Sequence, residues 1–298
     1  MALSMAKGFL KNGKTFAKKP NTDWLMFIPF IGTNPENIWA VAPREDNLKN
    51  FSDLGCHTTP NAEKVFQNSK ADQKTEFIVF LCTKPKIPFE TKNFFDFFAS
   101  TEYRNSTSKG SSFYVVSVML GVSVKKLESS IREKTAQHYH INRVMPNLGC
   151  EVNASPMVTT FAPTLNPTQK SNLETVLSAL GPVFDVVESV LDASVGISGS
   201  GLGFYCTFLQ ALADGAVADG LAREDAIRMG AQTAVAMGKL ILEGKHPIML
   251  RDSICSPAGS TIAGVQMLEE GKFSSLVMNV VKATSAKGRS VGAKIAET

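Results

Sequence analysis

The stretch EFIVFLCTK, residues 76–84, contains six consecutive apolar residues between a glutamate and a lysine. A short run that is apolar throughout and rich in aromatic and branched side chains is typical of a strand buried on both faces of a parallel sheet. NIWAVAP (37–43) and SFYVVSVMLG (112–121) have the same character, and each ends at a proline or glycine. These runs predict a buried parallel sheet.

The segments between these runs have helical patterns. Short amphipathic helices are expected in EDNLKNFSDLG (45–55), NAEKVFQNSK (61–70) and VSVKKLESSIRE (122–133), and INRVMPN (141–147) is expected to be a further strand and turn. Alternation of strands and helices is the pattern of a doubly wound α/β domain. The sequence therefore predicts a Rossmann-like domain over residues 1–163.

From residue 167 the pattern is helical. NPTQKSNLETVLSALG (166–181) starts with an Asn-Pro signal and ends on a glycine, and long alanine-rich helices are expected in 204–221, 222–244, 261–271 and 273–295. Several of them are apolar on more than one face, and such helices must be covered on both sides. We therefore expect residues 164–298 to form an all-α domain that pairs with another subunit.

The composition excludes several classes of partner. The 298 residues are 44% hydrophobic and 19% charged, and the formal net charge is only +4 with dispersed basic residues. Neither nucleic acid nor a membrane is expected as a partner. Five widely separated cysteines without metal-ligand spacing indicate reduced thiols and no metal site. We expect a cytoplasmic protein rather than a mitochondrial one.

SICSPAGSTIAG (253–264) interrupts the helical half with small and hydroxylated residues. A helix whose first turn contains Gly259, Ser260 and Thr261 offers unpaired backbone N–H groups that bind a carboxylate or phosphate. Pro257 fits such a helix start. The alternative is an ordinary cap on a surface helix.

The surrounding motifs extend this pattern. RVMPN, SGSG, ALADGAV, GLAREDA, AQT, HP, LRD, SPAGSTIAG and MN.V follow one another within about residues 141–292. In this order and spacing they closely resemble the C-terminal domain of pyrroline-5-carboxylate reductase. Residues 38–59, 80–86 and 115–128 resemble the family's upstream strands and turns more faintly.

The resemblance implies an oxidoreductase of proline biosynthesis. In this family a hydride passes from a nicotinamide cofactor to the C=N carbon of the cyclic imine 1-pyrroline-5-carboxylate and gives L-proline. Gly259, Ser260 and Thr261 would then bind the substrate carboxylate. Thr261 is the first candidate catalytic residue, with its hydroxyl near the imine nitrogen, and Ser256 is the second. The family also implies a homodimer, often within a larger ring.

The resemblance implies cofactor contacts as well. The matching positions are Ala42, Pro43, Arg44, Asn61, Lys84, Pro85, Pro146 and Asn147. No acidic residue at the end of the second strand is available for a free ribose, and Arg44 could meet a 2′-phosphate, so we expect NADPH, with NADH as the alternative. Leu148 and Gly149 depart from the usual Thr-Pro of the family.

One departure is larger. Residues 1–13 resemble the family's first helix, and the strand and glycine-rich loop that should precede it are missing. Residues 14–36 resemble an insertion without a family counterpart. Either the sequence is an incomplete version of the enzyme, which we favour, or residues 24–33 substitute for the lost strand.

Two other functions stay open at this point. The first is a non-catalytic oligomeric relative that has lost dinucleotide binding. The second is a related reductase that acts on another imine or on a 2-hydroxy acid.

Overall fold

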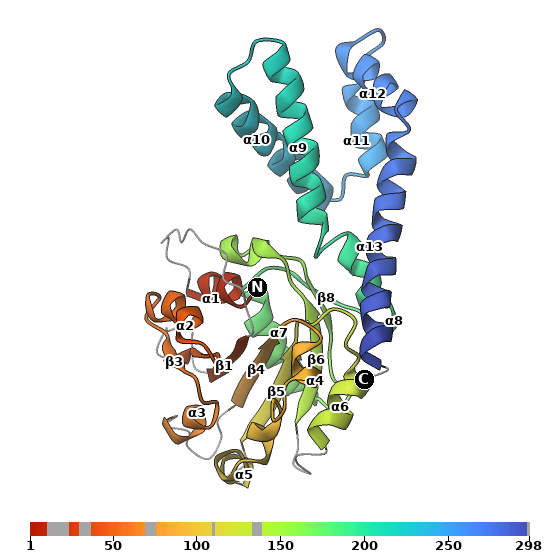
Figure 1. Cartoon of the computed structure of the whole chain (residues 1–298). Coiled ribbons are helices and arrows are strands. Elements are labelled where there is room, and N and C mark those ends of the chain that lie inside the picture. The colour runs from red at the N-terminus through yellow and green to blue at the C-terminus, as the bar shows by residue number, and fades with distance from the viewer. Residues whose placement is uncertain (11–23, 30–36, 69–75, 109–110, 133–138, 297–298) are drawn as a thin grey trace. The chain divides into compact units, whose positions relative to one another are not determined.

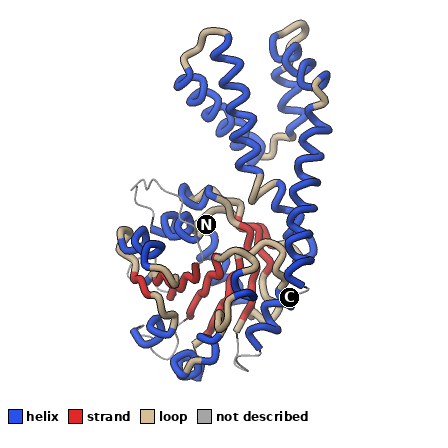
Figure 2. The backbone as a smooth tube through the Cα atoms, in the orientation of Figure 1, coloured by secondary structure: helices blue, strands red, loops and turns tan. Residues whose placement is uncertain are grey.

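The computed structural model describes residues 1–10, 24–29, 37–68, 76–108, 111–132 and 139–296. The chain divides into two compact units. Residues 1–199 together with 285–298 form unit 1, and residues 200–284 form unit 2. Figure 1 labels the elements along the chain, and Figure 2 shows helices and strands in the same view.

Unit 1 contains a mixed sheet with the order β3-β2-β1-β4-β5-β6-β7-β8. The strands are β1 (Trp24–Pro29), β2 (Trp39–Val41), β3 (His57–Thr59), β4 (Glu76–Cys82), β5 (Ser112–Ser117), β6 (His140–Met145), β7 (Met157–Thr160) and β8 (Val183–Asp185). Strands β4, β5 and β6 are parallel neighbours, and so are β2 and β3. The predicted strands in 37–43, 76–84, 112–121 and 141–147 are thereby confirmed.

The centre of the sheet differs from the expectation that its first strand is missing. Residues 24–29 form β1 and pair on both sides, with β2 and with β4. Both pairings are antiparallel. The substitution by residues 24–33, which was not the favoured alternative, is therefore observed for 24–29. The rest of the predicted insertion lies outside the described residues.

Helices cover both faces of this sheet. The helices of unit 1 are α1 (Ala2–Leu10), α2 (Glu45–Ser52), α3 (Glu63–Asn68), α4 (Ile87–Glu90), α5 (Thr101–Ser108), α6 (Val124–Arg132), α7 (Pro167–Ser178) and α8 (Glu188–Leu191), with 3-10 turns η2 (Asp96–Ala99), η3 (Leu148–Val152) and η4 (Asp192–Gly196). Side chains of α1, α2 and α7 share one core with the sheet, and those of α3, α5 and α6 share the other. Unit 1 is thus a three-layer α/β/α domain.

Unit 2 is helical, as the alanine-rich pattern predicts. Its helices are α9 (Gly201–Ala218), α10 (Arg223–Leu242), α11 (Pro247–Ile254), α12 (Ser260–Glu270) and the first half of α13 (Phe273–Ala296). The sequence did not predict α11. In the described part of the chain, no helix combines the length and the apolar character needed to cross a membrane.

The sequence places the domain boundary at residues 163 and 164, whereas the compact units separate at residues 199 and 200. The reason is that the intervening residues pack on the sheet. Leu173 and Leu177 of α7 are buried in the first core, and β8 pairs with β7. The last turns of α13 also return to unit 1, where Ile295 is buried.

Candidate functional site

A pocket of about 580 Å³ opens at the carboxyl end of β2 in unit 1. Val41, Ala42 and Pro43 form one wall, directly where the strand ends. Its volume lies in the range of about 300–1,000 Å³ that small-molecule sites occupy. Ligands of doubly wound sheets bind outside the carboxyl ends of the strands, so this pocket is a candidate binding site.

Asn61 lines the same pocket from the turn after β3. Its side-chain oxygen accepts the N–H of Glu63 at 2.8 Å and so holds the start of α3. Its backbone N–H donates to the Thr59 hydroxyl at 3.2 Å. These bonds fix the turn, and they show that the carboxamide oxygen of Asn61 already has a partner.

The opposite wall comes from the segment after β4. Ile87, Thr91, Phe94 and Phe97 are among its lining residues. This segment starts at the predicted Lys84-Pro85 turn, where the N–H of Ile87 donates to the Lys84 carbonyl at 3.0 Å. The turn therefore places this wall, although neither of its two residues lines the pocket.

Arg44 lies next to the pocket at the N-cap of α2. Its backbone is extended, with φ −113° and ψ 127°, and its side chain is exposed. Its guanidinium forms no hydrogen bond or ion pair with any described residue, although its backbone carbonyl accepts the N–H of Asn47 at 3.1 Å. The guanidinium is thus available to an anion, whereas Glu63 and Asp96 add negative charge to the pocket lining.

Pro146 and Asn147 follow β6 and do not line this pocket. Asn147 is only 8% exposed. Its side-chain oxygen accepts the N–H of Gly149 at 2.8 Å, and its Nδ2 donates to the Ser198 carbonyl at 3.0 Å. The carboxamide therefore joins the end of β6 to the segment that precedes α9, and it offers little to a ligand.

The described residues provide a binding site for only part of a dinucleotide cofactor. Such cofactors rest their pyrophosphate on a glycine-rich turn between the first strand and the first helix. In unit 1, β1 begins at this edge, because Trp24 pairs with Cys82, the last residue of β4. The chain therefore enters β1 at the edge where the pyrophosphate turn would lie. Helix α1 precedes β1 in the sequence, so no turn leads from β1 into α1. The pocket at β2 fits the adenosine half, but the described residues do not include that turn.

In unit 2, the predicted helix start is confirmed. Helix α12 begins at Ser260, with Gly259 as an extended N-cap (φ −77°, ψ 164°). Among the described residues, no side chain caps this end, so its first N–H groups stay open to a ligand. Thr261 is half-buried, whereas Ser256 and Ser260 are exposed.

A tight turn brings the other predicted residues to this end. The N–H of Gly259 donates to the Ser256 carbonyl at 3.0 Å, and Ala258 has a left-handed φ of 57°. A Cβ on Gly259 would lie 2.4 Å from the Ser256 hydroxyl oxygen. Ser256, Gly259, Ser260 and Thr261 therefore gather at one helix end, and any side chain at position 259 would force this turn to adjust.

Three buried thiols lie in unit 1: Cys56 directly before β3, Cys82 at the end of β4 and Cys150 in η3. Burial raises the pKa of Cys82 to about 12 and that of Cys56 to about 12. Burial also raises the pKa of Cys150. Within the described ranges, no group of three or more possible metal ligands occurs.

Sequence reasoning missed one polar cluster. Arg143 of β6 is 2% exposed and pairs with Glu188 and Asp192. A single arginine within the apolar run INRVM was the available signal. Its two partners are about fifty residues away in the chain, so no local pattern identified them.

Comparisons with known proteins agree on one family. A family model described as pyrroline-5-carboxylate reductase dimerisation matches residues 188–291. Pyrroline-5-carboxylate reductase 3 of Rattus norvegicus is 32% identical over 295 residues, which cover 99% of this chain and 93% of that protein. Pyrroline-5-carboxylate reductase of Methanosarcina acetivorans is 39% identical over 265 residues, 87% of this chain and 89% of that protein.

Solved structures support the fold. Plasmodium falciparum pyrroline carboxylate reductase with NADP bound superposes with a TM-score of 0.71 at 22% identity, covering 97% of this chain and 93% of that one. The reductase from Coxiella burnetii has the same TM-score at 23% identity, covering 97% and 94%.

Proposed function

The chain belongs to the pyrroline-5-carboxylate reductase family, and we propose that it reduces 1-pyrroline-5-carboxylate to L-proline, the last step of proline biosynthesis. The observation that carries this proposal is the start of α12, where open N–H groups and the Thr261 hydroxyl lie together. The substrate combines a carboxylate with a cyclic C=N bond, and this helix end suits both groups.

The N–H groups of the first turn of α12 bind the carboxylate. A helix N-terminus carries a partial positive charge and aligned donors, so it favours an anion. Gly259 allows the carboxylate to approach the backbone closely, and Ser260 adds a hydroxyl at the first helical position. Ser256 lies on the turn behind this end.

Thr261 acts at the other end of the substrate. The imine nitrogen is protonated near neutrality, so its carbon is already electrophilic and the protein need not supply a strong acid. The Thr261 Oγ1 accepts a hydrogen bond from that N–H⁺ group and fixes the orientation of the ring. The reduced nicotinamide cofactor supplies the hydride to the C=N carbon when it is bound.

The pocket at β2 holds the adenosine end of that cofactor. Ala42 and Pro43 form its strand side and Asn61 its turn side. Lys84 and Pro85 place the opposite wall, and Pro146 and Asn147 position the end of β6. The Arg44 guanidinium, which has no hydrogen-bond or ion-pair partner among the described residues, supports NADPH, whereas Glu63 and Asp96 support NADH. Our proposal is NADPH.

The chain forms a homo-oligomer through its dimerisation segment. We propose a homodimer as the smallest assembly, and such dimers can assemble into larger rings. The cytoplasmic location stays a prediction from the sequence.

The test is turnover by the purified full chain. Loss of NADPH absorbance on addition of the cyclic imine, with proline as product, supports the proposal, and its absence overturns it. Thr261→Val keeps the side-chain shape and removes the hydroxyl, which should lower kcat/KM by about 10- to 100-fold, because a bond to a charged group is lost. Thr261→Ser restores a hydroxyl and should recover most of this loss.

The direction of β1 favours a second candidate function, a non-catalytic oligomeric relative without dinucleotide binding. A calorimetric titration with NADPH and NADH separates the two. Micromolar binding of either cofactor supports the reductase, and binding that is absent supports the second candidate.

A further inference from the structure

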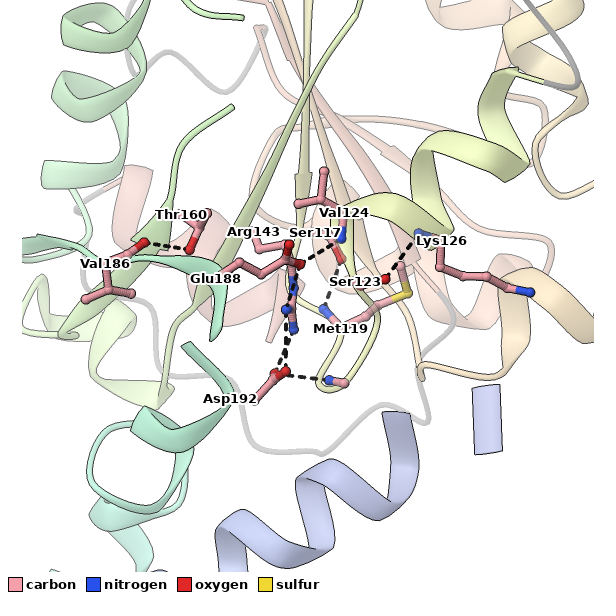
Figure 3. Close-up of polar contacts among 11 residues, drawn as sticks. Ser117, Met119, Ser123, Val124, Lys126, Arg143, Thr160, Val186, Glu188 and Asp192 are labelled. Atoms are coloured by element: carbon pink, nitrogen blue, oxygen red, sulfur yellow. Dashed lines mark hydrogen bonds and ion pairs between the residues drawn. The ribbon is translucent and has the colours of Figure 1, made fainter. Parts of the chain in front are cut away.

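Arg143 anchors an ion-pair cluster near the carboxyl end of β6 (Figure 3). Its Nη1 donates to the Glu188 carboxylate at 3.1 Å, and its Nη2 donates to the Asp192 carboxylate at 2.7 Å. The arginine side chain is 2% exposed, whereas those of Glu188 and Asp192 are 35% and 26% exposed. The cluster thus joins β6 to α8 and η4.

The two carboxylates also hold the loop between β5 and α6. The Oε1 of Glu188 accepts the N–H of Val124 at 2.7 Å, at the first residue of α6. The Oδ1 of Asp192 accepts the N–H of Gly121 at 3.3 Å. Because each carboxylate binds both the guanidinium and a backbone N–H, Arg143 fixes the loop through its partners (Figure 3).

The geometry of Gly121 ties this loop to the last helix as well. Gly121 has a left-handed φ of +77°, and a Cβ there would lie 2.7 Å from the backbone nitrogen of Gly292 in α13. Nearby, the Ser285 hydroxyl donates to the Ala193 carbonyl at 3.4 Å. Both segments that connect unit 1 to residues 200–284 therefore meet this cluster inside unit 1.

The ion-pair cluster of Arg143 lies near the edge of the sheet at which a ligand of unit 1 would bind. Strands β5 and β6 are parallel neighbours in which Ser117 pairs with Arg143, so their carboxyl ends lie at one edge. In doubly wound sheets, a bound dinucleotide contacts the loops at that edge. Hydride transfer requires a near-attack geometry, and a displacement of about 1 Å can cost about 100-fold in rate.

We propose that Arg143 is a positioning residue for the reduction, which acts through Glu188 and Asp192 to hold residues 119–124 at the carboxyl end of β5. This inference rests on the proposed function. Arg143 contacts neither reacting group. It sets the loop geometry on which the rate depends, while the pocket at β2 provides affinity for the adenosine end independently.

The test compares Arg143→Lys, Arg143→Met and Glu188→Gln in the full-length protein. Lysine keeps the charge but cannot bridge both carboxylates, methionine removes the charge, and Glu188→Gln keeps the acceptor for the Val124 N–H but weakens the ion pair. The matched control is Lys170→Met, which removes the exposed ion pair with Asp185 in the same unit.

Two measurements are made on each variant. The first is amide hydrogen exchange of peptides that contain residues 119–124, recorded without ligand. The second is steady-state kinetics with separate kcat and KM values for the cofactor and the imine. We expect faster exchange in this loop and a kcat that falls about 10- to 100-fold, with the cofactor KM within about two-fold of the wild-type value. Lys170→Met should match the wild type in both.

Unchanged exchange in residues 119–124 would overturn the proposal, and so would accelerated exchange with an unchanged kcat. If Arg143→Met does not fold, Arg143→Lys and Glu188→Gln decide. A wild-type protein that does not reduce the imine would disprove the proposed function and the role of Arg143 in it, while the exchange data still show whether the cluster holds the loop.

Discussion

Met26 of β1 pairs with Phe80 of β4 in antiparallel register. On its other side, Met26 pairs with Ala40 of β2, again antiparallel. A strand that enters the sheet from the opposite direction thus completes the centre of an otherwise doubly wound domain. As a result, the backbone N–H and C=O groups of β2 and β4 that face β1 have hydrogen-bond partners.

A proline at Met26 tests this arrangement. Proline cannot donate a ladder hydrogen bond and is excluded from central strands. Met26→Pro should lower the free energy of unfolding by about 3 kcal/mol or more, measured by urea denaturation. Glu45→Pro is the control, because it lies at the first position of α2 after an extended Arg44 and should be tolerated. Equal stability of the two variants would contradict a central β1.

The antiparallel direction of β1 could not be predicted from the sequence. The run WLMFIP is apolar enough for a strand, but its parallel or antiparallel pairing depends on the connections at both ends. The short strands β3, β7 and β8 were missed for a similar reason. They contain three or four residues each, and tertiary pairing rather than local pattern stabilises them.

The start of α12 was predicted correctly because its signal is local. Pro257 and Gly259 precede the helix within three residues of Ser260. In contrast, Arg143 and Asp192 are brought together only by the packing of η4 on the sheet. Local chain chemistry thus predicted the helix start at which we propose that the substrate binds, whereas the polar cluster required the structure.

Gly259→Ala tests the proposed carboxylate site at the start of α12. The added Cβ would lie 2.4 Å from the Ser256 hydroxyl oxygen and 3.0 Å from the Ser256 carbonyl oxygen, so the turn must move. We expect kcat/KM for the imine to fall about ten-fold, as for the loss of one charge-assisted bond, with the cofactor KM unchanged. Gln266→Ala, on the exposed side of the same helix, is the control. Wild-type kinetics in Gly259→Ala would remove this glycine from the proposed site.

The buried thiols predict how stability depends on pH. Burial raises the pKa of Cys56 and of Cys82 to about 12 in the folded state. The unfolded chain loses these protons near pH 9, about the ordinary thiol value, so it binds fewer protons than the folded chain above that pH. The contribution of the two protonated thiols to the free energy of unfolding is complete below about pH 9 and is lost as the pH rises towards 12. We therefore expect Tm to decline from about pH 9 upwards.

Scanning calorimetry at a series of alkaline pH values measures this slope. Cys56→Val and Cys82→Val should each make the decline in Tm shallower. Iodoacetamide labelling of the native protein near pH 8 should leave both thiols unmodified, and labelling in urea should modify them. A wild-type slope in the variant that combines Cys56→Val with Cys82→Val, or rapid native labelling, would show that these thiols do not keep their protons.

Exposed apolar residues of α13 indicate where two chains of the assembly meet. Leu276 and Met278 are 59% and 57% exposed, and Val277 between them is 42% exposed. Consecutive residues point to different sides of a helix, so apolar surface on more than one side of α13 needs a cover. These residues lie within the matched dimerisation segment, and a second copy provides that cover.

Light scattering should give a mass of at least two chains, and the double variant Leu276→Asp with Met278→Asp should shift it towards one chain. Val152→Asp, at a 74% exposed valine in unit 1 outside that segment, should leave the mass unchanged. A monomeric wild type, or an assembly that survives both charges, would place the interface elsewhere.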